Sequence, residues 1–423
     1  MMSVPHLPSM FPHFDLLYCS AQRMRNEGSV KRTESRNRQM TPALAAFTPE
    51  QGVFRWGIRF TLSVQFQEPS MPVRTILVTL LIMLGFAPVS VAQTAEELFL
   101  EGKAADESGI PEDAIAPYEQ ACEMDHGQAC NELGFAYFQA EGVETDLSKA
   151  LIYFEKACDL NDAMACGNLG VWWDKGMTGV EDMEKAQAYH RKACDLDFDT
   201  SCYDLGVALL DESDAPANTA DAMTLFQKAC DLGFPGGCYN LAVMYRDGVG
   251  DATDMSRARS LFTMGCETGD DEKSCLNLGI MELVGNGGEE DFERAQSHFN
   301  MACARNLGAA CRMMGDMYYD GSGMKKDYEQ ARHLYGKACI TGDVQGCYHQ
   351  AEMLARGRGG EESEEDALNL YIDACYAGLA EACHEAGEAY RRGRGAEKDR
   401  ELQAEYRDMA CQLNTEYRYC EDD

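Results

Sequence analysis

Apolar residues recur at helical spacing in two alternating kinds of segment from residue 95 onwards. In the first kind, exemplified by residues 130–142, Leu133 and Tyr137 share one helical face and a glycine closes the segment. In the second kind, exemplified by residues 145–160, Phe154 lies on such a face after a capping threonine or aspartate. The pattern predicts that this part of the chain is built from pairs of short helices.

The cysteines show that the helix pairs repeat with a nearly fixed period. From residue 122 onwards they fall into pairs whose members are eight or nine residues apart, and first members follow one another after 36 or, once, 37 residues. A period of this length is typical of helical solenoids, in which each unit stacks on its neighbours. We therefore predict an all-α fold, an α/α solenoid (superhelix) of about nine helix pairs over residues 93–423. The cysteine pairs are Cys122 with Cys130, Cys158 with Cys166, Cys194 with Cys202, Cys230 with Cys238, Cys266 with Cys275, Cys303 with Cys311, Cys339 with Cys347, Cys375 with Cys383, and Cys411 with Cys420.

A glycine recurs in the middle of the first helix, as at Gly134 and Gly206. Because glycine inside a helix costs about 0.5–1 kcal/mol relative to alanine, its recurrence needs a structural reason. We expect the second helix of the pair to approach closely there, and the recurring alanine of the second helix, such as Ala150, to serve the same contact from the other side.

Each cysteine pair is predicted to form a disulfide across the turn between two units. The first cysteine ends a second helix and the other begins the next first helix, so the turn brings the two backbones within the roughly 5.5 Å that a disulfide needs. Equivalent cysteines of adjacent units would have to span a helix layer of about 9–10 Å. Zinc, the competing interpretation, prefers two to four residues between its cysteines. Each bridge closes a loop of about nine residues, which is worth about 2–3 kcal/mol.

The first 92 residues carry no repeat. Residues 71–92 combine a start methionine, one arginine, an apolar core over 76–86 and small residues at the last and third-last positions. These features predict a signal peptide that is cleaved after Ala92. We interpret residues 1–70, which are basic and aperiodic, as a disordered, non-native upstream extension of the gene model. The alternative is an uncleaved signal anchor, although the apolar core is short for a bilayer span.

Charge narrows the choice of partner. The whole chain has a formal net charge of -34, and residues 93–423 hold 28 basic and 66 acidic residues, a net charge of -38. An acidic surface repels nucleic acid and anionic lipid, so the expected partner is a protein or peptide, which should be basic if it is charged. An export signal together with an even number of cysteines predicts a periplasmic or secreted protein without a membrane anchor in its mature form.

The repeated frame resembles a known family. LGFAY at 133–137, a glycine, then KALIYFEKAC at 149–158 resemble Sel1-like repeats, relatives of the tetratricopeptide repeat. The cysteine pair eight residues apart resembles the secreted Helicobacter cysteine-rich protein family. The resemblance covers about residues 95–420 and implies an exported solenoid with one disulfide per repeat and a concave groove lined by first helices. Gln350 and Ala386 depart from the frame's leucine and Glu282 from its aromatic residue, so looser packing is expected there.

Members of that family are described as penicillin-binding and weakly β-lactamase-like, so a β-lactamase-like hydrolase is the alternative function. A Ser-x-x-Lys does occur at Ser322–Lys325, but it lies in a glycine-rich turn without the Ser-Asp-Asn or Lys-Thr-Gly motif that accompanies it in such enzymes. The sequence contains no phosphate-binding loop, no HExxH and no DxDxDG calcium motif. We therefore assign no catalytic residue, metal ligand or cofactor.

The remaining candidate for a functional site is the concave groove lined by first helices. Residues one, five and eight positions after the second cysteine of a pair are predicted to face it, and tyrosine and arginine at such positions commonly anchor interfaces. Packing against the adjacent repeat is the competing interpretation for each tyrosine. The main hypothesis is an exported, non-enzymatic scaffold that binds a peptide or protein partner in this groove. The predicted groove residues are Asn131, Phe135, Phe138, Tyr203, Tyr239, Arg246, Arg312, Tyr319, Tyr348, His384 and Arg391.

Overall fold

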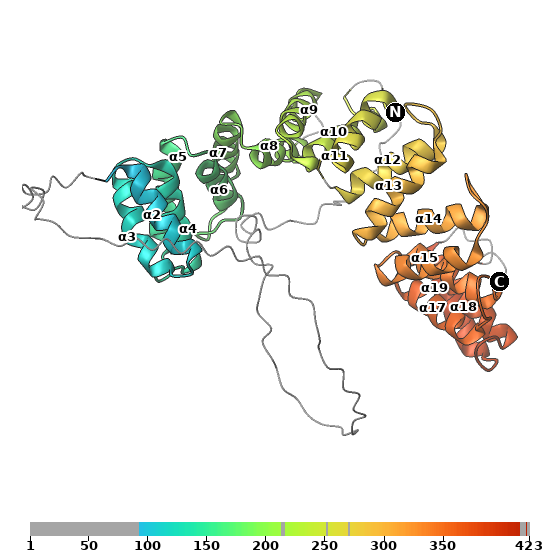
Figure 1. The fold of residues 1–423 in the computed structure, drawn as a ribbon. Helices are drawn as coiled ribbons and strands as arrows, with labels where there is room; N and C mark the ends of the chain where they lie inside the picture. Colours follow the sequence, from blue (N-terminus) through green and yellow to red (C-terminus); the bar gives the residue numbers. More distant parts are fainter. Residues whose placement is uncertain (1–92, 213–215, 251–252, 270, 415–419, 421–423) are drawn as a thin grey trace, which may run out of the picture. The chain divides into compact units, whose positions relative to one another are not determined.

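The computed structural model describes residues 93–212, 216–250, 253–269, 271–414 and 420. The predicted signal peptide and the segment before it lie outside these residues. Within the compact unit Ala95–Asp423, the described residues form eighteen α-helices and no strand (Figure 1). The prediction of an all-α fold is confirmed.

The helices form nine consecutive pairs. The first helices are α2 Ala95–Glu107, α4 Gly127–Gln139, α6 Ala163–Asp174, α8 Asp199–Glu212, α10 Pro235–Asp247, α12 Glu272–Val284, α14 Gly308–Asp320, α16 Val344–Ala355 and α18 Ala380–Arg392. The second helices are α3 Pro111–Glu123, α5 Leu147–Asp159, α7 Met183–Asp195, α9 Pro216–Asp231, α11 Met255–Glu267, α13 Phe292–Ala304, α15 Tyr328–Ile340, α17 Glu364–Tyr376 and α19 Arg400–Leu413. Each helix packs mainly against the helices directly before and after it, so the pairs stack in chain order as a solenoid.

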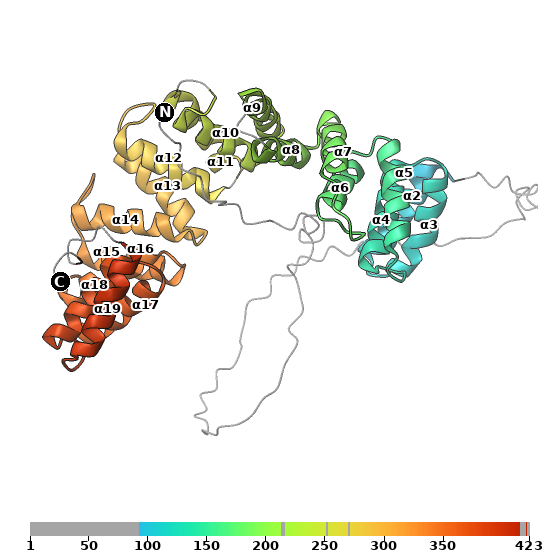
Figure 2. The same cartoon turned by 180° about the vertical axis from the view of Figure 1, so that it is seen from behind.

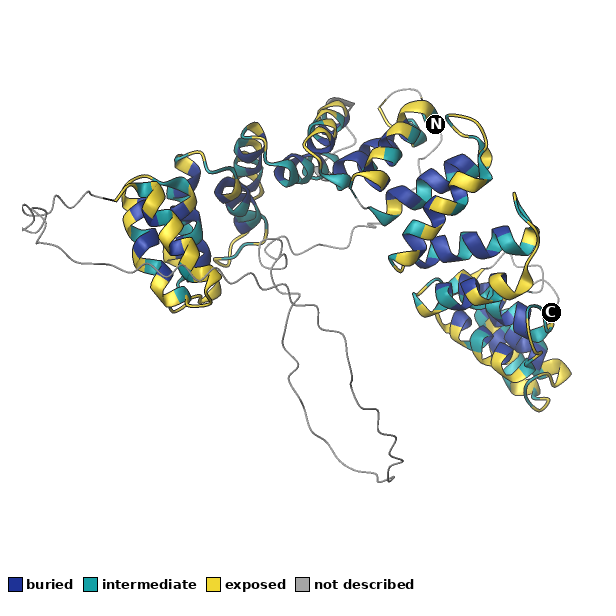
Figure 3. Cartoon of the chain, in the orientation of Figure 1, coloured by how far each residue is buried: buried dark blue, intermediate teal, exposed yellow. Residues whose placement is uncertain are grey.

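Within a pair, the recurring glycine of the first helix makes room for an aromatic ring of the second. A Cβ atom added to Gly134 would lie 2.5 Å from the ring of Phe154, and one added to Gly279 would lie 2.7 Å from the ring of Phe299. Both rings are fully buried, as is Ala150 of the second helix. The expected close approach at this glycine is therefore present, and Figure 3 shows the buried residues gathered where the helices face one another.

Nine disulfides join the end of each second helix to the segment that follows it. In the eight bridges that lead into another first helix, the two Cα atoms are 4.4–4.8 Å apart, and across the last bridge they are 5.7 Å apart. The stapled junctions of the predicted solenoid are therefore present. The bonded pairs are Cys122 with Cys130, Cys158 with Cys166, Cys194 with Cys202, Cys230 with Cys238, Cys266 with Cys275, Cys303 with Cys311, Cys339 with Cys347, Cys375 with Cys383, and Cys411 with Cys420.

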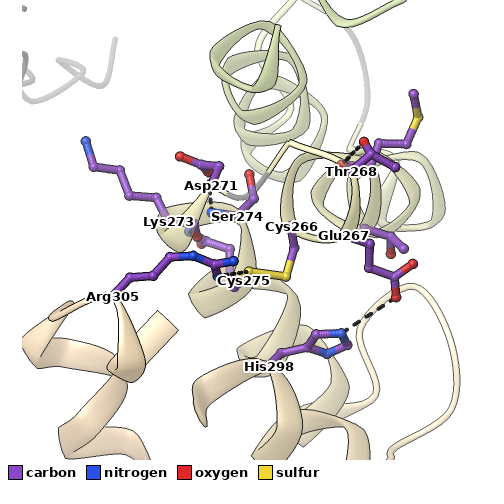
Figure 4. Close-up of a disulfide and its surroundings, with 12 residues drawn as sticks. Cys266, Glu267, Thr268, Asp271, Lys273, Ser274, Cys275, His298 and Arg305 are labelled. Atoms are coloured by element: carbon purple, nitrogen blue, oxygen red, sulfur yellow. Dashed lines mark hydrogen bonds and ion pairs between the residues drawn. A yellow bond between two sulfur atoms is a disulfide. The ribbon is translucent and has the colours of Figure 1, made fainter. Parts of the chain in front are cut away.

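In the eight staples that lead into another helix, the second cysteine is the fourth residue of that helix, and all of these cysteines except the half-buried Cys347 are buried. Cys130, Cys202 and Cys311 are fully buried. In Figure 4, which shows the bridge between Cys266 and Cys275, the guanidinium of Arg305 lies 3.8 Å from the sulfur of Cys275. The staples are therefore part of the packed junction between repeats.

In seven of the nine staples, the turn contains one residue with a left-handed backbone. Three positions after the first cysteine, Asp125 has φ 62°, Asn161 has φ 63° and Gly233 has φ 96°. These residue types tolerate left-handed φ, and their position ends the helix. The next backbone N–H then folds back on the helix, as Asp162 does by donating to the carbonyl of Ala157 at 3.0 Å.

A second contact between neighbouring repeats, which we call the clamp, lies at the ends of the helices opposite the disulfides. The loop between the two helices of a pair packs on the start of the second helix in the preceding pair. At Gly142, with φ 71°, an added Cβ atom would lie 2.5 Å from the carbonyl oxygen of Pro111. Each such repeat is therefore fixed to its neighbour at both ends. The same contact recurs at Gly287 on Met255, Gly359 on Tyr328 and Gly395 on Glu364.

Glu282 shows how one repeat replaces the expected aromatic residue. Its side chain is fully buried, with Oε2 2.6 Å from Nδ1 of His298 and Oε1 3.1 Å from Nε of Arg294. In three other pairs, the third residue of the second helix places a cation over the corresponding ring, as Lys149 does 4.7 Å above Tyr137. Arg294 occupies that same place and meets a carboxylate there, so the position is filled by an ion pair.

Candidate functional site

Three of the predicted groove residues at position one contact the next repeat. The Asn131 side chain is buried, and its oxygen accepts a hydrogen bond from Asn168 at 3.2 Å. Arg312 forms an ion pair with Asp343, the N-cap of α16, at 3.2 Å. Tyr203 packs against Phe234, just before α10, with ring centroids 5.0 Å apart.

The other predicted residues also have partners within the chain. Phe135 packs edge-on against the Phe154 ring and Tyr239 against the Phe262 ring, and the Tyr348 ring lies 5.7 Å from that of Tyr371. Arg246 donates to the side-chain oxygen of Asn277 at 2.6 Å, which links α10 to α12. Tyr319 meets the Tyr328 ring at 5.4 Å and accepts a hydrogen bond from Arg358. The half-buried side chains among them remain predicted partner contacts.

A pocket of about 210 Å³ lies among α14, α15 and α16, three helices that contact one another (Figure 1 and Figure 2). Asp316, Tyr319 and Asp320 line it from α14, and Tyr335 lines it from α15. The Tyr335 hydroxyl donates to Asp316 at 2.8 Å. Burial raises the pKa of Asp316, although the hydrogen bond from Tyr335 acts in the opposite direction. Burial and the nearby Asp316 raise the pKa of Tyr335, so this phenol stays a hydrogen-bond donor.

The α16 side of the pocket carries a paired charge network. Nδ1 of His349 lies 3.3 Å from Glu352, and the Arg356 guanidinium lies 3.1 Å from the same carboxylate. Burial acts to raise the pKa of Glu352, but the hydrogen bond from His349 and the charge of Arg356 outweigh burial and lower the pKa. Met353 forms an apolar part of the wall, and Arg358 reaches in from the loop after α16.

The pocket lies against one face of the first helix α16. His349, Glu352 and the C-cap residue Arg356 line it, and they stand two, five and nine positions after the second cysteine, Cys347, a spacing that puts them on one helical face. We call the residues at positions two, five and nine of the first helices the first-helix surface. Of the predicted groove residues, only Tyr319 lines the pocket.

The chemistry of the first-helix surface changes along the chain. Position five is apolar in the five first helices from α4 to α12 and acidic in α14, α16 and α18. Except for the buried Phe135, these side chains are half-buried. This change is visible in the sequence once the repeats are aligned, and it is the signal that could have located the pocket. The residues at position five are Phe135, Val171, Val207, Val243, Ile280, Asp316, Glu352 and Glu388.

The alternative enzymatic site gains no support from the geometry. Ser322 lies in the loop between α14 and α15, where its N–H donates to the carbonyl of Met317 at 3.1 Å. In the described part of the chain, no group of three or more His, Cys, Asp or Glu side chains is arranged to hold a metal ion. Within the same residues, no helix combines the length and apolar character that a bilayer crossing requires.

A comparison with known protein families identifies the same repeat. The family model described as Sel1 repeat matches seven stretches that together cover more than half of the chain: residues 127–162, 163–198, 200–234, 235–270, 273–307, 308–343 and 380–406. No curated protein matches the sequence.

Solved structures resemble the fold. One is c5321, a protective antigen of uropathogenic Escherichia coli with an SLR fold, at 21% identity and TM-score 0.55, covering 75% of this chain and 80% of that one. Another is a Sel1 repeat protein from Oxalobacter formigenes, at 21% identity and TM-score 0.56, covering 75% and 93%. Cysteine-rich protein B of Helicobacter pylori is 30% identical with TM-score 0.27, covering 31% and 93%.

Proposed function

The chain belongs to the Sel1 repeat family, and from this we propose that it is an exported scaffold that binds a protein partner along its first-helix surface. Solenoids of this kind present an extended row of side chains, one set from each repeat, and they commonly bind proteins. The peptide or protein is the ligand, and the fold itself carries no reaction.

The strongest support is the arrangement of position five. Half-buried valine and isoleucine side chains succeed one another from α6 to α12, and paired charges follow from α14 to α18. A position that only fills the core of a repeat needs an apolar side chain of suitable size. Position five instead changes from aliphatic to charged residues along the chain, which favours a role in recognition. A partner segment with an apolar part and a charged part would complement both stretches.

Export is supported by the disulfides. Nine bridges in one chain are typical of an oxidising compartment, because cytosolic thiols are kept reduced. We propose the periplasm or the outside of the cell as the destination and residues 71–92 as the cleaved signal. Mass measurement of the exported chain would test the start and cleavage sites together.

Partner capture can test the surface directly. The mature chain is cross-linked to its surroundings, and the recovered partner is compared between wild type, the double variant Val207→Glu with Val243→Glu, and Ile152→Glu. Glutamate occupies the same register at Glu352 and Glu388, so the fold accommodates it. Ile152, on second helix α5, is 61% exposed and serves as the matched control.

We expect the double variant to lose the partner and Ile152→Glu to keep it. Equal recovery of the partner with both variants would contradict the proposed surface. Far-ultraviolet circular dichroism checks that both variants keep the helical fold.

A further inference from the structure

We propose that the pocket among α14, α15 and α16 receives an arginine side chain of the partner. This inference rests on the proposed function, because it names the partner's chemistry at one place on the first-helix surface. Three observations about the pocket support it: its size, its charge and its aromatic wall.

Size indicates a single side chain. Pockets that enclose a whole small molecule usually measure about 300–1,000 Å³. This pocket measures about 210 Å³ and opens on the surface where a partner chain would lie. One long side chain entering from that chain fits the space better than a free ligand does.

The charges in the wall leave one acid without a partner. Arg356 is paired with Glu352 at 3.1 Å, and Arg358 donates to the hydroxyl of Tyr319. Asp320 is the one charged lining residue whose side chain makes no hydrogen bond or ion pair within the described part of the chain. It follows Asp316 by one helical turn, and like charges at this spacing repel one another. A cation in the pocket would be attracted to both carboxylates.

The aromatic wall already holds a guanidinium. Arg358 lies 5.5 Å above the ring of Tyr319 and 5.7 Å above that of Tyr328. In another repeat, Arg257 of α11 also stacks on a tyrosine, Tyr245, at 5.1 Å from the ring and 2.8 Å from its hydroxyl. A planar guanidinium can stack on tyrosine while it bonds to a carboxylate, which a lysine ammonium does less well. Arginine is therefore the expected residue.

Methionines at equivalent positions of successive repeats can serve as probes of arginine binding. Methionines stand six positions after the second cysteine in four successive first helices, and Met353 lines the pocket. The mature chain is labelled with ¹³C-methyl methionine and titrated with N-acetyl-arginine amide. Met353 should shift with saturation while Met244 and Met281, at the same register in α10 and α12, should not. N-acetyl-citrulline amide has the same shape without the charge and should leave Met353 unmoved.

Asp320→Asn should weaken arginine amide binding about five-fold, as expected for loss of one exposed ionic contact. Asp247→Asn, at position nine of α10, is the matched control and should leave the affinity unchanged. Equal shifts with citrulline amide, equal shifts at Met244 and Met281, or unchanged affinity in Asp320→Asn would each overturn the arginine site. Partner capture with the Asp320→Asn variant distinguishes the two proposals. If this variant still captures the partner and the arginine titration fails, only the arginine pocket is rejected and the first-helix surface stands.

Discussion

The replacement of Glu282 by glutamine should destabilise one repeat junction selectively. The carboxylate is fully buried and faces three cations or potential cations: His298 at 2.6 Å, Arg294 at 3.1 Å and Arg259 at 3.7 Å. Glutamine keeps the volume but removes the charge. His298 and Arg259 lie mostly out of solvent, so they would lose a buried counter-charge.

The expected loss is about 3 kcal/mol, near the lower end of the roughly 3–5 kcal/mol measured when one partner of a buried ion pair is removed. The lower end applies because the Arg294 side chain is 52% exposed and can return to water. His298 also has a second carboxylate: Glu267 lies 3.8 Å from Nε2, the ring nitrogen that does not face Glu282 (Figure 4).

A double variant, Glu282→Tyr with His298→Tyr, gives the opposite expectation. It would restore the pair found at the same register in α4–α5, where the Tyr137 and Tyr153 rings stack at 5.6 Å. Replacing a buried ion pair with well-packed apolar residues is often neutral or stabilising by about 1–4 kcal/mol. The introduced ring at position 282 would also receive Arg294 above it, as Tyr245 receives Arg257.

Native-state hydrogen exchange is the suitable assay, because units of a solenoid can open separately. Amides of α12 and α13 should exchange faster in Glu282→Gln, while those of α4 and α5 provide the internal reference. Unchanged protection in Glu282→Gln, or a loss in the double variant as large as in the single one, would refute the reasoning.

Three other perturbations follow from the structure. Replacing both Cys158 and Cys166 with serine should cost about 2–3 kcal/mol, read as faster amide exchange at the α5–α6 junction only. Gly359→Ala should lower the urea midpoint more than Gly378→Ala, since both have positive φ but only the added Cβ at Gly359 meets the Tyr328 carbonyl; equal losses would contradict the clamp. Burial, then Asp106 and Asp162, raise the pKa of Glu132 from 4.5 to about 7, so the folded chain holds this proton more tightly and stability falls as pH rises between these values. Glu132→Gln should match wild type below pH 4.5 and exceed it above pH 7 in urea unfolding.

The helix pairs and their staples could be predicted because the information is local. The spacing of Cys158 and Cys166 brings a helix end and a helix start together whatever the rest of the chain does. The glycine frame is equally local, since the ring of Phe154 approaches Gly134 within one pair. The helices, the staples and the glycine contact could therefore be predicted from the sequence.

The pairing of buried polar side chains and the contacts between helix pairs could not be predicted in the same way. The sequence suggested looser packing at Glu282, whereas the carboxylate is fully buried beside Arg259, His298 and Arg294, which come from α11 and α13. The pocket likewise depends on how far each first helix is rotated about its axis. The helical period places residues in stripes, but only the packing of α14 on α16 shows that positions two, five and nine form the open stripe.

The nine short staples also bear on how such a chain matures. Eighteen sulfurs permit very many mispaired forms, yet each correct partner is only eight or nine residues away. Short loops close fastest, so in a chain exported as proposed each bond would form as its hairpin emerges, before a distant thiol arrives. Oxidation would then proceed from the first repeat to the last in step with export, with little work left for a disulfide isomerase.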